Sequence, residues 1–253
     1  MKYLLQRSEL RALRAFVGPE TLIALDYDGT LAPIVARPED ARMADTTRAL
    51  LTQVAKRYPV VILTGRARID ALSLLAGVPV LEVIGSHGAE TQGTPVTRFL
   101  RRVESWRAQL RESLRALGGV RIEDKRYSLA VHYRQSEDPQ AAEQQISRAA
   151  GALDGARLVG GKKVVNVVPE DAPDKGAALL AACTRLGCSH AVFAGDDDTD
   201  EAAFAAAPAA QVFTVRIGNS ENSRATYYLR AQPEIDELLR ALLEARAAAP
   251  AKS

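Results

Sequence analysis

Cysteine is scarce in this chain of 253 residues, and neither sign of charge is in clear excess. The two cysteines, Cys183 and Cys188, show no CxxC spacing and no partner cluster, which indicates reduced packing residues of a cytoplasmic protein. A formal net charge of +2 argues against a general nucleic-acid or membrane-surface partner. No apolar run approaches the roughly 18 residues that a membrane helix needs. The hydrophobic fraction of 47% is that of an ordinary globular protein, long enough for one large domain or two smaller ones.

The motifs of nucleotide and zinc sites are also missing. No Gly-Lys-Ser/Thr follows a glycine at P-loop spacing, and no GxGxxG occurs. The three histidines, His87, His132 and His190, lie far apart in the sequence and lack the spacing of zinc ligands. The amino-terminal stretch "MKYLLQRSELRALRAF" places charges between apolar residues at helical spacing, so it predicts an amphipathic helix and not a signal peptide.

Short apolar runs alternate with segments of helical spacing along most of the chain. The runs lie in the stretches "LIAL", "YPVVIL", "VLEVI", "HAVFA" and "AAQVFTVRI". Runs without period-two alternation are typical of strands buried on both faces, and strands that alternate with helices indicate a mostly parallel α/β sheet. Because such sheets bind ligands beyond the carboxyl ends of their strands, the loops that follow these runs are candidate sites.

The middle of the chain, residues 95–168, shows a different pattern. Two stretches of helical spacing, "FLRRVESWRAQLRESLRAL" and "PQAAEQQISRAAGAL", enclose the alternating stretch "YSLAVHYR", and "RLVGGKKVVNVVP" closes the region. Strands beside helices with polar faces predict a small α+β module inserted into the larger fold. Residues 1–94 and 169–253 would then form the core, with hinges at both junctions.

Four loops rich in polar residues and glycine stand out, each after an apolar run or at a helix start. They are Asp26-Tyr27-Asp28-Gly29-Thr30, Thr64-Gly65-Arg66, Lys175-Gly176 and Gly195-Asp196-Asp197-Asp198-Thr199-Asp200-Glu201. If the loops converge at one sheet edge, a hard cation such as Mg²⁺ would neutralise the acidic cluster. The cation, the lysine and free backbone amides would together bind a phosphoryl group.

Two carboxylates at the end of one strand, Asp26 and Asp28, suit covalent phosphoryl transfer. One carboxylate would act as the nucleophile and form an aspartyl-phosphate, which divides one difficult displacement into two easier ones. The other would protonate the leaving oxygen and later deprotonate water. The pair is therefore predicted to be a nucleophile and an acid/base, held together by a metal.

A calcium-binding EF-hand is the main alternative for the acidic loop "GDDDTDE". Asp196, Asp198 and Asp200 provide the alternating carboxylates of an EF-hand. However, Glu201 stands where the calcium loop needs glycine, and Ala207 stands where it needs its closing glutamate. The acidic loop is therefore assigned to the phosphoryl site.

The motifs DxDGT, TGR, Lys-Gly and GDDxTDE, in that order, resemble those of the haloacid dehalogenase superfamily of aspartate-nucleophile phosphatases over nearly the whole chain. The stretches "GSHGAE", "EDKRYSLAVHYR", "GKKVVNVVP" and "GDDDTDE" are more narrowly similar to the trehalose-6-phosphate phosphatase family. The resemblance implies an α/β fold, a doubly wound parallel-sheet core with a smaller α+β cap of the C2 type at residues 95–168. It implies a Mg²⁺-dependent enzyme that hydrolyses trehalose 6-phosphate through an aspartyl-phosphate. We expect a cytoplasmic monomer with a sugar-phosphate substrate and no nucleic-acid or membrane partner.

The resemblance also assigns roles in the core. Asp26 would be the nucleophile and a metal ligand, and Asp28 would be the acid/base and give the metal its backbone carbonyl. Asp196 would be the third metal ligand. Thr64 and the backbone amides of Gly65 and Arg66 would bind phosphate oxygens, and Lys175 would balance the phosphate charge. Asp197 and Asp200 would support the metal site without binding the metal directly.

In the cap, Glu123 and Lys125 match the family's Glu-x-Lys, which contacts the disaccharide, and Lys162 matches the lysine of its Lys-x-x-x-Glu. The glutamate of that second motif is replaced by Asn166, which still hydrogen-bonds but is shorter and uncharged. His87 of "GSHGAE" is a further candidate for substrate contact. The replacement leaves open a phosphatase for sucrose, mannosylglycerate or glucosylglycerate phosphate. An alternative of a different class is a catalytically silent regulator that binds a sugar phosphate.

Overall fold

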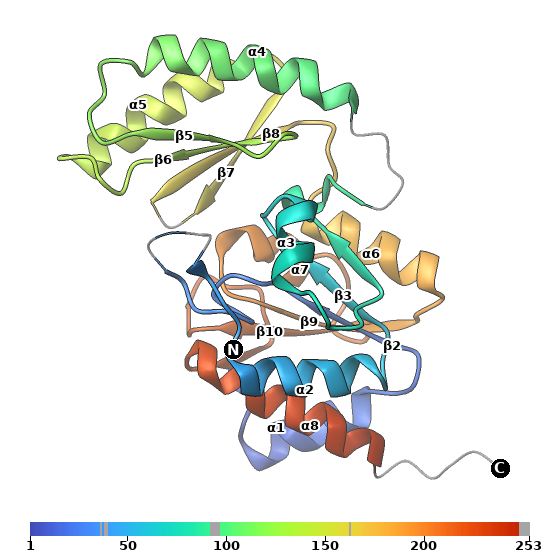
Figure 1. Cartoon of the computed structure of the whole chain (residues 1–253). Helices are drawn as coiled ribbons and strands as arrows, with labels where there is room; N and C mark the ends of the chain where they lie inside the picture. The colour runs from blue at the N-terminus through green and yellow to red at the C-terminus, as the bar shows by residue number, and fades with distance from the viewer. Residues whose placement is uncertain (36, 38–39, 92–96, 162, 248–253) are drawn as a thin grey trace.

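The computed structural model describes residues 1–35, 37, 40–91, 97–161 and 163–247 (Figure 1). They form two β-sheets, one above the other in the view of Figure 1, each covered by helices. Among the described residues, no helix is long and apolar enough to cross a membrane.

The larger sheet has seven strands in the order β1-β11-β10-β9-β2-β3-β4, and its neighbouring strands run parallel. Its strands are β1 (Lys2–Tyr3), β2 (Thr21–Leu25), β3 (Val60–Leu63), β4 (Glu82–Ile84), β9 (His190–Gly195), β10 (Val212–Ile217) and β11 (Tyr227–Leu229). Residues from β2, β3 and β9 are buried almost throughout, as the continuous apolar runs predict.

Helices cover both faces of this sheet, which makes it doubly wound. Within β2, Ile23 and Leu25 pack in one apolar cluster and Leu22 and Ala24 in another, because successive side chains of a strand point to opposite faces. The first cluster includes residues of α1 (Arg7–Phe16), α2 (Asp45–Ala55), α3 (Arg68–Leu74) and α8 (Ile235–Ala247), and the second those of α6 (Lys175–Leu186) and α7 (Glu201–Phe204). The predicted α/β class is confirmed.

The smaller sheet is antiparallel, and its strand order is β5-β6-β8-β7. Its strands are β5 (Arg121–Asp124), β6 (Leu129–His132), β7 (Ala156–Gly161) and β8 (Val164–Pro169), and its helices are α4 (Thr97–Ser113) and α5 (Pro139–Gly151). Both helices lie on the face turned away from the parallel sheet (Figure 1). Trp106 of α4 and Ile146 of α5 pack there against Leu129 and Val131 of β6.

The opposite face of the smaller sheet carries the predicted cap residues. Because Leu129 and Val131 point to the helices, their neighbour Ala130 points the other way, toward the parallel sheet. Ala130 pairs with Glu123 of β5 on one side and with Asn166 of β8 on the other. Period-two alternation thus places Glu123 and Asn166 on the same face.

Two details differ from the sequence-based expectations or lie beyond them. The amphipathic helix begins only at Arg7, because Lys2 and Tyr3 form the edge strand β1 beside β11. The first junction predicted between core and cap falls among residues 92–96, which lie outside the described residues. The division at 94/95 and 168/169 therefore stays a prediction. Short 3₁₀ turns complete the fold at η2 (Ser86–Gly88), η3 (Asp198–Asp200) and η4 (Gln232–Glu234).

Candidate active site between the two sheets

A cavity of about 310 Å³ lies between the carboxyl end of the parallel sheet and the smaller sheet. Segments that follow the adjacent strands β9, β2, β3 and β4 line it, as expected for a ligand site of an open parallel sheet. The predicted site residues in its lining are Asp26, Asp28, Gly65, Arg66, His87, Glu123, Lys125, Asn166, Lys175, Asp196 and Asp197. Thr64 and Asp200 are buried outside this lining, and Lys162 lies outside the described residues.

Asp26 and Lys175 form an ion pair beneath the cavity. Asp26 directly follows β2, and its backbone N–H donates to Ala194 O of β9 at 2.9 Å. Lys175 is the first residue of α6, and its Nζ lies 3.1 Å from Asp26 Oδ1 and 2.6 Å from Asp200 Oδ1. Burial by itself would lower the pKa of Lys175, but the carboxylates of Asp200 and Asp26 raise it above its ordinary value. Lys175 therefore stays charged beside Asp26.

The buried carboxylates of Asp26, Asp196 and Asp200 have oxygen atoms within 4.8 Å of one another. Burial raises the pKa of Asp26 well above its ordinary 3.8; the charge of Lys175 opposes this shift, and those of Asp200 and Asp196 add to it. One lysine does not balance three carboxylates, and carboxylate oxygens are the ligands that Mg²⁺ prefers. The donor set therefore fits a divalent cation.

Asp200 maintains the shape of the acidic loop. Its Oδ2 accepts the backbone N–H groups of Asp196 and Asp197, both at 3.0 Å, while its Oδ1 accepts from Lys175 Nζ. Asp26 and Asp196 line the cavity, whereas Asp200 is fully buried outside it. This arrangement suits the predicted division between ligands and a supporting carboxylate.

Gly29 allows the first and last loops to approach each other. Its φ is +76°, which favours glycine, and a Cβ at this position would collide with the carboxylate of Asp196. The glycine of DxDGT is thus required by the closeness of the acidic loop as well as by the turn.

The carboxylate of Asp28 is paired with the side chain of Arg66. Arg66 Nε donates to Oδ2 at 2.7 Å, and a terminal nitrogen donates to Oδ1 at 2.6 Å, which is the bidentate geometry of a strong ion pair. The guanidinium also lies 5.5 Å from the ring centroid of Tyr27. The sequence had assigned only the backbone amide of Arg66 a role, so this side-chain pairing is a feature that the motif alone did not reveal.

The Thr64-Gly65-Arg66 segment, here called the TGR loop, is tied to the end of β4. Thr64 N–H donates to Ile84 O at 2.9 Å, and Thr64 O accepts from His87 N–H at 3.0 Å. The Thr64 hydroxyl accepts the backbone N–H of Arg66 at 3.2 Å. In this structure, the amide expected to hold phosphate thus turns toward the threonine hydroxyl.

On the smaller sheet, Glu123 is paired with His132. Glu123 Oε2 lies 2.6 Å from His132 Nε2 and 3.9 Å from a terminal nitrogen of Arg121. The hydrogen bond to His132 lowers the pKa of Glu123 to about 2; burial opposes this shift, and the charge of Lys125 supports it. Glu123 is therefore an anionic hydrogen-bond acceptor in the cavity wall.

Lys125 contributes a cationic ammonium group and Asn166 a neutral amide to the same wall of the cavity. Lys125 Nζ donates to Gly65 O of the TGR loop at 3.2 Å, so this side chain spans from one sheet to the other. Its burial lowers the pKa, while Glu123 raises it in part. Asn166 is buried, and its Nδ2 donates to Val159 O at 3.3 Å.

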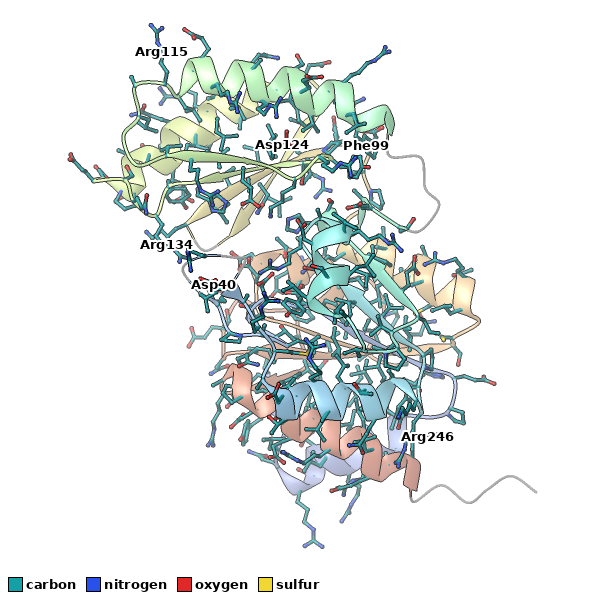
Figure 2. The ribbon with its side chains drawn as sticks, in the orientation of Figure 1. Asp40, Phe99, Arg115, Asp124, Arg134 and Arg246 are labelled. Carbon is teal, nitrogen blue, oxygen red and sulfur yellow. The ribbon has the colours of Figure 1, made fainter. Side chains whose placement is uncertain are left out.

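Sequence reasoning missed several residues of the cavity lining. Arg121 and His132 face each other across β5 and β6, and the alternation that includes Glu123 would have indicated Arg121. Ile34 lines the cavity on the side of the parallel sheet, and Arg134 on the side of the smaller sheet. Figure 2 shows Arg134 at the edge of the smaller sheet that faces the parallel one. No motif distinguishes Ile34 in the sequence, whereas Arg134 ends the stretch "EDKRYSLAVHYR" but was assigned no role there.

Fold and site together define a phosphatase of the haloacid dehalogenase fold, a phosphoric monoester hydrolase. A family model described as Trehalose-phosphatase matches residues 24–233. The chain therefore belongs to the trehalose-phosphatase family.

Relatives agree with this assignment. The chain is 31% identical over 246 residues to "Probable trehalose-phosphate phosphatase 4" of Oryza sativa subsp. japonica, covering 90% of this chain and 67% of the relative. It is 35% identical over 227 residues to "Trehalose-phosphate phosphatase" of Mycobacterium marinum, covering 84% of this chain and 58% of the relative. A solved structure described as a "trehalose-6-phosphate phosphatase related protein" has 25% identity and a TM-score of 0.73, covering 90% of this chain and 100% of that one.

Proposed function

We propose that this protein is a Mg²⁺-dependent phosphatase that hydrolyses trehalose 6-phosphate to trehalose and phosphate. The observation that carries the proposal is the meeting of two residue sets in one cavity. Asp26, Lys175 and Asp196 come from the parallel sheet, and Glu123 and Lys125 come from the smaller sheet. The first set suits phosphoryl transfer, and the second suits binding of a polar, hydroxyl-rich leaving group.

In the first step, a carboxylate oxygen of Asp26 attacks phosphorus, and the bond between phosphorus and the sugar oxygen breaks. Asp28 gives its proton to that oxygen, so trehalose leaves as the neutral alcohol. In the second step, water attacks phosphorus of the aspartyl-phosphate and passes its proton to Asp28. Phosphate leaves, and Asp26 and Asp28 return to their starting states.

The residues that would hold Mg²⁺ are Asp26 and Asp196, through their carboxylates, and Asp28, through its backbone carbonyl. When bound, the cation would supply positive charge against the phosphate dianion. Asp197 and Asp200 would keep the acidic loop in place. Thr64, Gly65 and Lys175 would bind phosphate oxygens, with Lys175 also holding Asp26 in position through their ion pair.

The two carboxylate oxygens of Asp28 are occupied by the Arg66 side chain, so one of them must be released before it can contact the leaving oxygen of the sugar. We propose that a phosphate oxygen takes the Arg66 guanidinium from Asp28 when substrate binds. Asp28 would then be free to reach the leaving oxygen. Substrate binding and the position of the acid/base would thus be coupled through one arginine.

Residues 95–168 would act as a cap that contacts the sugar through Glu123, Lys125 and Asn166, with Lys162 as a further candidate. The floor of the cavity binds phosphate and metal, which all substrates share, so discrimination between sugars would depend on this cap. The contact of Lys125 Nζ with Gly65 O supports the proposal, because it brings a cap side chain to the TGR loop.

The experiment is phosphate release from a panel of sugar phosphates, each with Mg²⁺ and with EDTA. We expect trehalose 6-phosphate to have the highest kcat/KM, EDTA to abolish turnover and added Mg²⁺ to restore it. Asp26→Asn serves as the blank. Binding of trehalose 6-phosphate without hydrolysis would instead support the silent regulator, and turnover that survives EDTA would refute the metal site.

A phosphatase for another sugar phosphate is the second candidate, and Asn166 is the observation that favours it. If trehalose 6-phosphate is the substrate, Asn166→Glu restores the family's residue, so kcat/KM should be unchanged or higher. If a different sugar is the substrate, the new carboxylate would be buried without a partner and kcat/KM should fall. Assaying the variant against trehalose 6-phosphate and sucrose phosphate separates the two cases.

A further inference from the structure

The strand β4 ends in a left-handed turn that the proposed mechanism does not use. Ser86, His87 and Gly88 have φ angles of 50°, 58° and 115°, which residues other than glycine seldom adopt. The turn is fastened to the TGR loop, since Ser86 N–H donates to Arg66 O at 2.7 Å and His87 N–H donates to Thr64 O at 3.0 Å. Backbone strain of this kind persists where the surroundings hold it, often at functional sites.

The turn directs the imidazole of His87 into the cavity wall beside Gly65. His87 lines the cavity with only 9% of its surface exposed, and a Cβ at Gly65 would collide with the imidazole. Within the described residues, neither Nδ1 nor Nε2 of His87 has a hydrogen-bond partner. Buried polar groups nearly always have one, so the ring is arranged for a partner that arrives with a ligand.

The surroundings of the ring indicate the chemistry of that partner. Burial lowers the pKa of His87 well below its ordinary 6.5, the charges of Lys125 and Lys175 lower it further, and the nearby Asn166 side chain opposes the shift in part without meeting hydrogen-bond geometry. A neutral imidazole offers one donor and one acceptor, so it can either donate to a sugar hydroxyl or accept from one. Lys125 and Lys175 attract the phosphate group of the substrate. The uncharged imidazole of His87 is therefore suited to the uncharged sugar.

We infer that His87 is a substrate-binding residue that hydrogen-bonds a hydroxyl of the phosphorylated sugar ring and so favours sugar phosphates over other phosphate monoesters. The inference rests on the proposed function and adds a specificity contact on the parallel-sheet side of the cavity. It places sugar recognition at the turn after β4, in addition to the cap.

The test compares variants of the whole protein on two substrates, trehalose 6-phosphate and p-nitrophenyl phosphate. His87→Phe retains a ring but removes both nitrogens, and His87→Asn retains a donor and an acceptor on a residue that tolerates positive φ. His190→Phe is the matched control, because His190 is exposed and lies outside the cavity lining.

We expect His87→Phe to lower kcat/KM for trehalose 6-phosphate by about 10- to 100-fold, the effect of one lost hydrogen bond to substrate. Its kcat/KM for p-nitrophenyl phosphate should change by less than about threefold. His87→Asn should retain more activity on the sugar phosphate than His87→Phe, and His190→Phe should match the wild type. An equal loss on both substrates would overturn the inference, because it would mean that the ring only maintains the fold.

A spectroscopic measurement separates this inference from the proposed function. In the Asp26→Asn variant, the ¹⁵N signals of the His87 ring should move when trehalose 6-phosphate is added and stay in place with p-nitrophenyl phosphate. If the wild type prefers another sugar phosphate, the proposed substrate is wrong. The kinetic and the ¹⁵N measurements on His87 are then made with that sugar phosphate in place of trehalose 6-phosphate. If the wild type cleaves p-nitrophenyl phosphate but no sugar phosphate, both proposals are wrong.

Discussion

Replacing Asp200 with alanine should destabilise the parallel-sheet unit more than any other change in the acidic loop. Asp200 is fully buried, and its two oxygens accept from Lys175 Nζ and from the backbone N–H groups of Asp196 and Asp197. Within the described residues, alanine would leave the buried ammonium of Lys175 with Asp26, at 3.1 Å, as its remaining carboxylate partner. It would also leave two N–H groups without their acceptor.

The expected loss follows from these contacts. Removing one partner of a buried ion pair costs about 3–5 kcal/mol, and an orphaned buried donor costs about 1–3 kcal/mol. Because Lys175 keeps Asp26 and water can enter from the cavity, we expect a total loss of about 3–5 kcal/mol in the free energy of unfolding. Asp198→Ala is the matched control, since its side chain is 76% exposed and should change stability by less than about 0.5 kcal/mol.

Urea denaturation followed by circular dichroism measures both losses. EDTA is present throughout, so that a difference in metal binding does not contribute. The fluorescence of Trp106, the single tryptophan, reports on the smaller sheet and shows whether that unit remains folded in the variant. A loss below about 1 kcal/mol for Asp200→Ala would refute the view that this carboxylate holds the acidic loop together.

Asp26→Asn should abolish phosphate release while leaving the circular dichroism spectrum unchanged, because an amide is neither a nucleophile nor a charged ligand. Near-normal turnover of this variant would refute the proposed mechanism. Glu123→Ala and Lys125→Ala should each lower kcat/KM for the disaccharide phosphate by about 10- to 100-fold and spare a small aryl phosphate. Equal losses on both substrates would show that these two residues maintain the fold instead. Because the folded pKa of Glu123 is about 2 against an ordinary 4.5, its stabilising contribution is complete above pH 4.5 and is lost as the pH falls toward 2. The ¹³C signal of its carboxyl group should therefore show no titration above pH 4.5, and His132→Phe should raise its midpoint; an unchanged midpoint would contradict the assigned cause.

Much of the parallel sheet and of the cavity floor is predictable from sequence, for a physical reason. A strand buried on both faces must be apolar along its whole length, so "LIAL" and "VVIL" are visible without a structure. Polar residues that directly follow such strands can only lie at the carboxyl edge of the sheet. Asp26 and Asp196 could therefore be placed together before any coordinate was known.

The partners of these side chains were not predictable in the same way. The pairing of Asp28 with Arg66, and of Glu123 with His132, depends on side-chain conformations and on the register between strands, which motif spacing does not specify. The edge strand β1 was missed because two residues carry no periodic signal. Local pattern thus identified the loops, and tertiary packing decided what each side chain contacts.

The order of strands in the parallel sheet also has a consequence for folding on the ribosome. Central strand β2 pairs on one side with β9, so residues 21–25 wait for residues 190–194 to be made. At about 5–20 residues per second, that interval lasts roughly 10–30 s. The four strands of the smaller sheet lie within residues 121–169 and, among the described residues, pair only with one another, so this unit can fold during the interval. Until β9 emerges, one edge of β2, with unpaired backbone N–H and C=O groups, stays open to other chains, so slow translation at high expression favours aggregation.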